Sequence, residues 1–196
     1  TDILYRHLTD EAYVNSLGHT PCLENMPQEL GHNYWHGWRE KPMYKVWLDG
    51  IYMLQPFLAN HAARIGDRRQ LELVQEDVLL APNGMYYHAG NGKGDVCNFF
   101  WARAMGWYGM AMVDIMEVLP EQYLEKRKAA LRLFVDGMLK YQDGDGIWAN
   151  LADRPATETN RPESSGTAMM SYIILKGVRK GWLDESYREA GIRAFV

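Results

Sequence analysis

Asp49 stands in the apolar, aromatic stretch WLDGIYM (residues 47–53), where a carboxylate is an unusual residue. A buried carboxylate without a partner is energetically costly, and an Asp-Gly pair disfavours the middle of a helix. Two interpretations are open: Asp49 caps the start of a helix, or it is a general acid or base. The apolar neighbours favour the second role, because they stabilise a protonated carboxyl group near neutral pH.

Arg103 lies inside the apolar segment FWARAMGWY, with Trp101 before it and Trp107 four residues after it. On a helix, positions 103 and 107 share one face. Arg103 is either a paired core arginine or a fork that binds the carboxylate of a ligand. A guanidinium flanked by two indoles fits an anionic sugar, since flat sugar faces stack on aromatic rings.

His88 lies in the loop sequence MYYHAGNGKGD, where either a functional or a structural role is open. His32 and His36 have the spacing of two zinc ligands, but the Glu of HExxH and a third ligand are missing, so no metal site is predicted. Residues 143–148 (DGDGIW) lack the downstream ligands of a calcium loop and are predicted to form a turn.

The elements that must position these residues are predicted to be helices arranged in pairs. The first members are apolar and rich in Met, aromatic and small residues, whereas the second members are more charged, with Asp67 and Asp184 as caps. In chain order, the predicted helices cover residues 47–65, 68–80, 99–118, 121–141, 165–180 and 185–195.

The helix pairs repeat along the chain, with Asp49, Arg103 and Ser165 near the starts of the three first members. Apolar first helices and amphipathic second helices indicate an inner and an outer layer. We therefore predict an all-α solenoid or toroid, with short strand edges only around residues 85–87 and 146–149. The inner helices would begin at one common mouth, where their positive ends favour an anionic ligand.

The composition narrows the classes of partner. The chain has 196 residues, 47% of them apolar and 23% charged, with a net charge of −4. The sequence lacks the concentrated basic face that is typical of nucleic-acid-binding proteins. No apolar segment reaches the roughly 20 residues of a membrane span. The N-terminal sequence shows no signal pattern. Cys22 and Cys97 could form a disulfide, but two free thiols in a reducing compartment are favoured, so we expect a cytoplasmic protein.

Several motifs, in order and spacing, resemble glycoside hydrolase family 105, the unsaturated rhamnogalacturonyl hydrolases, which are related to the unsaturated glucuronyl hydrolases of family 88. These motifs are WLDGIYM followed by PFLA, then YYHA, FWARAMGWYGMAMVD and ESSGTAMMSY. The segment GIWANLADRP also resembles the family loop GLWYQVLDxP, with Asn150 where Gln is usual. The resemblance runs from about Trp35 to the C-terminus.

The resemblance implies an (α/α)6 barrel, a toroid of six helical hairpins, of which this chain would hold only a part. The family chain is nearly twice as long, and its second important Asp has no counterpart in residues 1–34. We therefore expect a single catalytic-type domain over residues 1–196 that is incomplete at both ends.

The activity that the resemblance implies is removal of a terminal 4,5-unsaturated galacturonic acid from rhamnogalacturonan (pectin) oligosaccharides. In the family, an Asp protonates the C4=C5 double bond, water adds at C5, and the resulting hemiketal falls apart. Asp49 matches this acid/base. The resemblance implies neither a metal nor a cofactor, and its partner is an unsaturated uronic-acid oligosaccharide.

The resemblance also implies a sugar pocket. The positions that match its lining are His88, Trp101, Arg103 and Trp107, with Trp47 and Met53 beside them.

Two other functions are open. A non-catalytic carbohydrate-binding or structural α/α toroid is favoured by the missing upstream Asp and by Asn91, where many relatives carry Asp. A protein-binding helical scaffold is disfavoured, because its inner faces would be charged rather than rich in Met and Trp.

Overall fold

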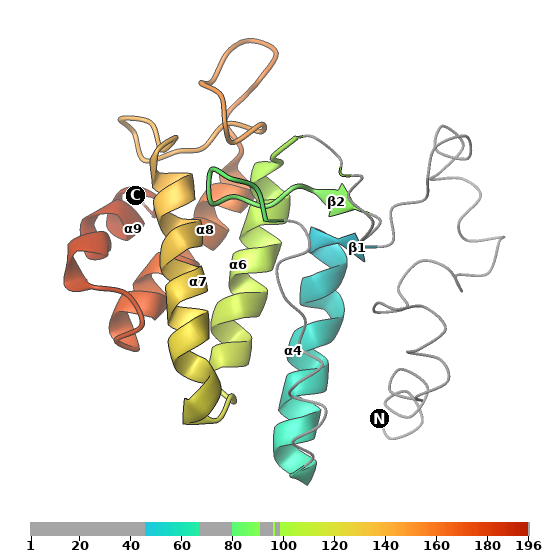
Figure 1. Cartoon of the computed structure of the whole chain (residues 1–196). Helices are drawn as coiled ribbons and strands as arrows, with labels where there is room; N and C mark the ends of the chain where they lie inside the picture. Colours follow the sequence, from blue (N-terminus) through green and yellow to red (C-terminus); the bar gives the residue numbers. More distant parts are fainter. Residues whose placement is uncertain (1–45, 67–79, 91–95, 97–98, 196) are drawn as a thin grey trace, which may run out of the picture.

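The computed structural model describes residues 46–66, 80–90, 96 and 99–195, and the structural statements below concern these residues. Apart from one antiparallel pair of two-residue strands, the described elements are helical (Figure 1). In chain order they are β1 (Val46–Trp47), α4 (Leu48–Ile65), β2 (Ala89–Gly90), α6 (Ala102–Met116), α7 (Glu121–Leu139), α8 (Ser164–Arg179), the 3-10 helix η1 (Glu185–Tyr187) and α9 (Arg188–Arg193).

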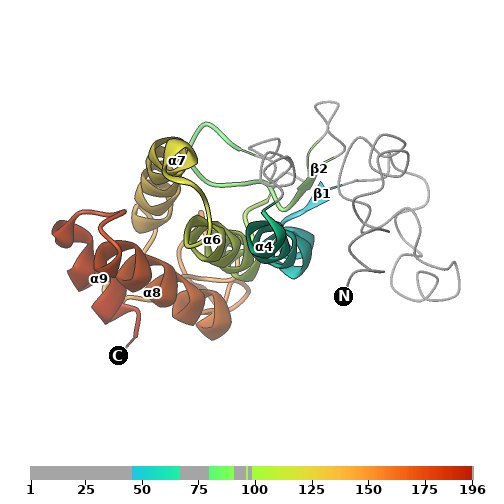
Figure 2. The same cartoon turned by 90° about the horizontal axis from the view of Figure 1, so that it is seen from below.

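The inner layer consists of α4, α6 and α8, with α6 packed between the other two. All three begin at the same end of the molecule (Figure 1), and Figure 2 shows α6 between α4 and α8. Two glycines allow α6 and α8 to approach closely. A Cβ on Gly106 would lie 2.6 Å from Met169 Sδ, and a Cβ on Gly166 would lie 2.7 Å from the backbone of Ala102.

The outer layer is formed by α7, which runs opposite to α6, and by α9, which packs on α8 (Figure 1). Leu131, Phe134 and Met138 of α7 are fully buried, whereas the other side of this helix is exposed. The Phe134 ring meets Tyr86 and Tyr108 edge-on, at centroid distances of 6.0 and 5.9 Å. The predicted amphipathic outer helix is thereby confirmed.

The helices predicted over 47–65, 99–118, 121–141 and 165–180 are confirmed, with ends displaced by a few residues. The last predicted helix begins instead as η1, where Asp184 Oδ1 accepts a hydrogen bond from Ser186 N at 2.9 Å. The predicted helix 68–80 and its cap lie outside the described residues, except for Leu80.

The predicted strand edges are present as isolated bridges and the turn is confirmed, whereas the β1–β2 pair was not predicted. Isolated antiparallel bridges join Leu80 to Tyr86 and Ala149 to Pro162. In the turn at 143–148, Asp143 Oδ1 accepts hydrogen bonds from the backbone N–H groups of Asp145 and Ile147. This carboxylate oxygen therefore stabilises the backbone of the turn.

A polar cluster joins α6 to α8 near the ends opposite to the common start. The ammonium group of Lys176, whose side chain is 4% exposed, donates to Asp114 at 2.7 Å, Glu117 at 2.8 Å and Tyr172 at 3.0 Å. Burial lowers the pKa of Lys176, but these hydrogen bonds outweigh burial and raise it. Hydrogen bonds from Lys176 and Lys180 lower the pKa of Glu117 to about 2.

Candidate functional site

Asp49 lies in the first turn of α4 and not at its cap. The helix begins at Leu48, because the preceding Val46 and Trp47 are extended and paired with β2. The interpretation of Asp49 as a helix cap is therefore wrong. Its side chain is 32% exposed, yet Oδ2 is buried and makes no hydrogen bond within the described part of the chain. Within the described residues, this carboxyl oxygen therefore stabilises no backbone group.

The β1–β2 pair brings His88 to the start of α4. Trp47 pairs with Ala89, and Leu48 N donates to the His88 carbonyl oxygen at 3.1 Å. As a result, His88 Nδ1 lies 3.6 Å from Asp49 Oδ2. Burial lowers the pKa of His88, and the opposing effect of the Asp49 carboxylate is smaller. At neutral pH, a neutral imidazole therefore faces the Asp49 carboxyl group.

Trp101 connects His88 to Arg103. The Trp101 and His88 rings meet edge-on, with centroids 5.3 Å apart and an interplanar angle of 81°. The Cζ atom of Arg103 lies 4.5 Å from the centre of the Trp101 ring, which is a cation–π arrangement. Arg103 Nε is buried, and among the described residues it has no hydrogen-bond partner. Arg103 is thus held by an aromatic ring, and its guanidinium retains donors for a ligand.

Trp107 lies one turn after Arg103 on α6, as the spacing predicts. Tyr52 of α4 packs against it, with ring centroids 4.9 Å apart. Burial and the nearby Asp114 raise the pKa of Tyr52. Sequence reasoning missed Tyr52, although its spacing of three residues from Asp49 on a helix was the available signal.

The loop between α7 and α8 forms a further edge of the site. It pairs with the segment before α6, since Ala102 N donates to Asn150 O at 2.9 Å and Ala152 N donates to Phe100 O at 2.8 Å. In addition, Trp101 Nε1 donates to Asn150 Oδ1 at 2.9 Å. Asn150 therefore contacts the site, a role that no local sequence pattern predicts.

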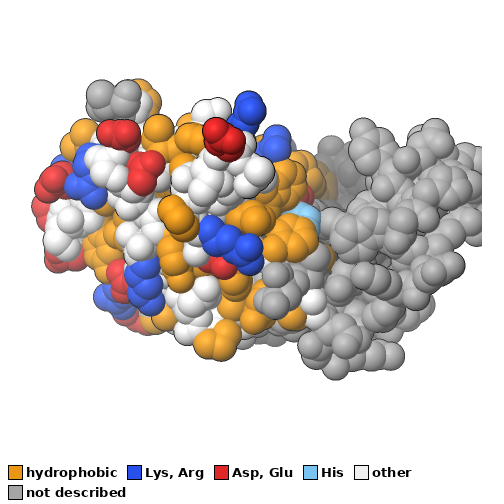
Figure 3. All heavy atoms as spheres, turned by 90° about the horizontal axis from the view of Figure 1, so that it is seen from above, with side chains coloured by type: hydrophobic (Ala, Val, Ile, Leu, Met, Phe, Trp, Pro, Cys, Tyr) orange, Lys and Arg blue, Asp and Glu red, His pale blue; other side chains and the backbone are white. Residues whose placement is uncertain are grey.

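The start of α8 lies at the same end as the starts of α4 and α6 (Figure 1). There, Ser165 Oγ donates to Glu163 Oε1 at 2.6 Å, and the same carboxylate accepts from Gly166 N. The hydroxyl of Ser165 is thus used to support the Glu163 cap. Figure 3 views this end of the molecule, where a histidine lies beside hydrophobic side chains and basic side chains are exposed on the same face.

The remaining predicted residues are only partly described. The side chain of Trp47 lies outside the described residues, although its backbone forms β1. Met53 is 60% exposed, one turn after Asp49, and its packing beside the sugar stays a prediction. The residues that lie wholly outside the described ranges are Cys22, His32, His36, Asn91 and Cys97.

The described ranges hold neither a metal cluster nor a membrane span. No group of three or more His, Cys, Asp or Glu there could hold a metal ion. None of the described helices is long and apolar enough to cross a bilayer.

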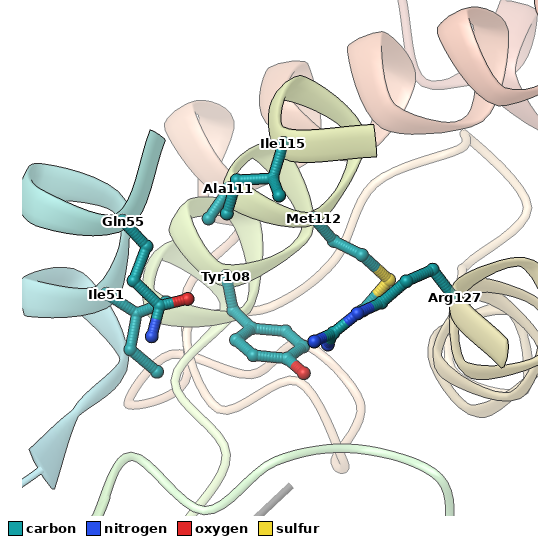
Figure 4. A pocket seen from close by; sticks show the side chains of 7 residues that line it. All are labelled: Ile51, Gln55, Tyr108, Ala111, Met112, Ile115 and Arg127. Atoms are coloured by element: carbon teal, nitrogen blue, oxygen red, sulfur yellow. The ribbon is translucent and has the colours of Figure 1, made fainter. Parts of the chain in front are cut away.

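A separate pocket lies between α4, α6 and α7 (Figure 4). In this view the Arg127 side chain extends from α7 toward the ring of Tyr108. The lining residues are Ile51, Gln55, Tyr108, Ala111, Met112, Ile115 and Arg127. The lining includes none of Asp49, His88, Trp101, Arg103 and Trp107, so this pocket is distinct from the site around Asp49.

Paired inner and outer helices, with an acid, a guanidinium and aromatic rings near the starts of the inner helices, define an α/α toroid with a candidate carbohydrate site. The chain belongs to Glycosyl Hydrolase Family 88, whose family model matches residues 2–196. The predicted relationship to families 88 and 105 is confirmed.

Three relatives illustrate the match. A family 105 glycoside hydrolase structure from C. acetobutylicum is 34% identical, with a TM-score of 0.69 over 76% of this chain and 47% of its own. The unsaturated 3S-rhamnoglycuronyl hydrolase of Alteromonas sp. is 26% identical over 155 residues, covering 71% of this chain and 37% of that protein. The unsaturated rhamnogalacturonyl hydrolase YesR of Bacillus subtilis is 29% identical over 99 residues, covering 47% of this chain and 28% of that protein.

The matches cover less than half of the length of each of these relatives. The prediction of an all-α toroid that is only partly present in this chain is confirmed. The assignment of residues 1–196 to one catalytic-type domain stays a prediction.

Proposed function

We propose that this chain belongs to an enzyme that removes a terminal 4,5-unsaturated galacturonic acid from rhamnogalacturonan oligosaccharides. The observation that carries the proposal is the buried Oδ2 of Asp49, which has no hydrogen bond among the described residues and lies 3.6 Å from His88. The family, and the names of the Alteromonas and Bacillus relatives, support the broader class of unsaturated uronyl glycoside hydrolases.

In the proposed function, Arg103 and the indoles of Trp101 and Trp107 bind the substrate. The planar guanidinium offers paired N–H donors that match a carboxylate, and the sugar acid carries one at C5. Its Cζ lies 4.5 Å from the Trp101 ring centre, so the aromatic face limits where the guanidinium can lie. Trp107 supplies a second flat surface for the sugar ring.

The proposed reaction begins with Asp49 as a carboxylic acid, which transfers its proton to C4 of the C4=C5 double bond. The positive charge that develops at C5 and the ring oxygen is relieved when water adds at C5 and gives its proton back to the Asp49 carboxylate. The C5 hemiketal then opens, and the hemiacetal left at C1 releases the remaining sugar as an alcohol. These steps use one acid/base group and water, without a metal or cofactor.

His88 supports this cycle by being neutral. A neutral imidazole 3.6 Å from Oδ2 places no opposite charge beside the proposed acid. Burial lowers the pKa of His88, which favours the neutral imidazole at neutral pH.

The test is Asp49→Asn in the full-length protein, assayed by the ultraviolet absorbance that an unsaturated disaccharide loses when its C=C–carboxylate group is hydrated. We expect turnover to fall by about 10²- to 10⁴-fold, the usual contribution of a general acid. Asp145→Asn, an exposed residue of the 143–148 turn, is the matched control and should retain full activity. Unchanged turnover in Asp49→Asn would refute the proposed role.

A non-catalytic carbohydrate-binding toroid is the alternative, since the Arg103–Trp101 platform could bind a uronate without turnover. Quenching of tryptophan fluorescence by the disaccharide, with no hydrolysis by the wild-type protein, would select this alternative. A cytoplasmic location is likewise a proposal, supported by the predicted free thiols.

A further inference from the structure

We propose that Asn150 is a positioning residue for substrate binding: its side-chain oxygen holds the indole of Trp101, which in turn holds the guanidinium of Arg103. The inference rests on the proposed function, because it assigns the binding of the sugar carboxylate to Arg103. The side chain of Asn150 is hydrogen-bonded to Trp101, so Asn150 acts on the guanidinium through that ring.

The bond between Asn150 and Trp101 is well defined. An indole N–H is a donor only, and that of Trp101 donates to Asn150 Oδ1 at 2.9 Å. The backbone of Asn150 is held on both sides, since its N–H donates to Arg161 O at 2.8 Å and its carbonyl accepts from Ala102 N at 2.9 Å. The acceptor is therefore fixed relative to the start of α6.

The loop that carries Asn150 is itself anchored. Trp148 is fully buried, and its Nε1 donates to Met138 O at 2.8 Å. Asn160 closes the far side of the loop, because its Oδ1 accepts from Leu151 N at 2.7 Å and its Nδ2 donates to Pro155 O at 3.1 Å. The position of Asn150 is thus set by the loop and does not depend on the Trp101 side chain.

The orientation of the Trp101 ring decides two contacts at once. The first is the contact with Arg103, whose Cζ lies 4.5 Å from the centre of the Trp101 ring. The second is the edge-on contact with His88, in which the two ring centroids lie 5.3 Å apart. Arg103 Nε has no hydrogen bond within the described residues, whereas the Trp101 ring contacts the guanidinium directly. If the indole rotates, the guanidinium gains other rotamers and meets the sugar carboxylate less often.

The kinetic test is Asn150→Leu, which removes the acceptor while keeping a similar size. We expect KM for an unsaturated disaccharide to rise about 3- to 10-fold, the usual effect of losing one hydrogen bond, with kcat changed by less than about 2-fold. Glu158→Gln, an exposed change on the same loop, should leave both constants unaltered. An unchanged KM in Asn150→Leu would overturn the proposal.

Combining Asn150→Leu with a second substitution, Trp101→Phe, distinguishes an effect through the Trp101 indole from a general effect on the loop. Trp101→Phe keeps an aromatic ring but has no N–H to donate. Asn150→Leu should therefore raise KM no further when it is combined with Trp101→Phe. If it raises KM by the same factor in both backgrounds, Asn150 acts through the loop alone and the proposal is wrong.

A measurement without substrate makes this inference independent of the enzymatic activity. The indole N–H resonance of Trp101 is identified in a proton–nitrogen spectrum as the signal that Trp101→Phe lacks. We expect this signal to shift in Asn150→Leu and to exchange faster with solvent. An unshifted signal overturns the positioning role even in an active enzyme. A shifted signal in a protein without turnover supports the bond while the proposed function fails.

Discussion

At the scale of single residues, Arg103 is unusual because an aromatic ring holds it and no acid pairs with it in the described part of the chain. Its Cζ lies 4.5 Å from the Trp101 ring centre, and its Nε is buried without a hydrogen bond there. A core arginine with a purely structural role would be neutralised by an acid. In the proposed function, the carboxylate of the sugar is the anion that pairs with Arg103.

Arg103→Lys tests this assignment. Lysine keeps the charge but loses the planar fork and the stacking on the indole. We expect KM for the unsaturated disaccharide to rise about 10- to 100-fold, the range for hydrogen bonds to charged groups, while the thermal midpoint stays near that of the wild type. Steady-state kinetics and thermal melting measure the two quantities. Arg179→Lys, at the exposed far end of α8, is the control and should match the wild type in both.

At the scale of elements, the close approach of α6 and α8 depends on glycine. Gly166 lies in the first turn of α8, where a Cβ would come within 2.7 Å of both the carbonyl carbon and the oxygen of Ala102. The end of a flexible side chain could move away from this added Cβ, but the backbone atoms of Ala102 cannot. The same contact sets the start of α8 against the start of α6, next to Trp101.

Gly166→Ala is therefore expected to push α8 away from α6 and to lower the free energy of unfolding by about 1–3 kcal/mol, as overpacking does. The thermal midpoint should fall by about 2–4 °C for each kcal/mol in a chain of this size. Gly144→Ala is the matched control, because a Cβ there meets nothing within 4 Å. Equal melting of the two variants would contradict the close packing.

At the scale of the whole molecule, the Lys176 cluster links the far ends of α6 and α8. Glu117 accepts from both Lys176 and Lys180 at 2.8 Å, and these bonds lower its pKa from 4.5 to about 2. The unfolded chain therefore binds a proton at this group at a higher pH than the folded protein does. The stabilisation is present above pH 4.5 and is lost as the pH falls toward 2.

Glu117→Gln should be less stable than the wild type by about 1 kcal/mol at pH 7, a modest value because the carboxylate is partly exposed. The difference should shrink as the pH falls through the range from 4.5 to 2, since the wild-type carboxylate is then protonated. Urea denaturation across this pH range measures it. The control is Glu125→Gln, which breaks the ion pair between Glu125 and Lys128. Because the Glu125 side chain is 74% exposed, this variant should lose less stability than Glu117→Gln. A difference that does not depend on pH would exclude the ion pairs as its source.

The sequence by itself determined the helices and the faces they present. Helix formation follows from neighbouring residues, so the apolar pattern of 99–118 and the amphipathic pattern of 121–141 were sufficient to predict α6 and α7. The same local spacing placed Arg103 and Trp107 one turn apart. The motifs around Asp49, His88 and Arg103 also indicated the family.

Only the tertiary structure decided which residues from separate segments meet. Pairing of β1 with β2 puts His88 beside Asp49 and starts α4 at Leu48, so that Asp49 is not the cap. Packing of the 146–163 loop against the start of α6 joins Asn150 to Trp101 across 49 residues. Such contacts depend on how whole elements pack, because the free energy of a contact between distant segments is not encoded in the residues next to either one.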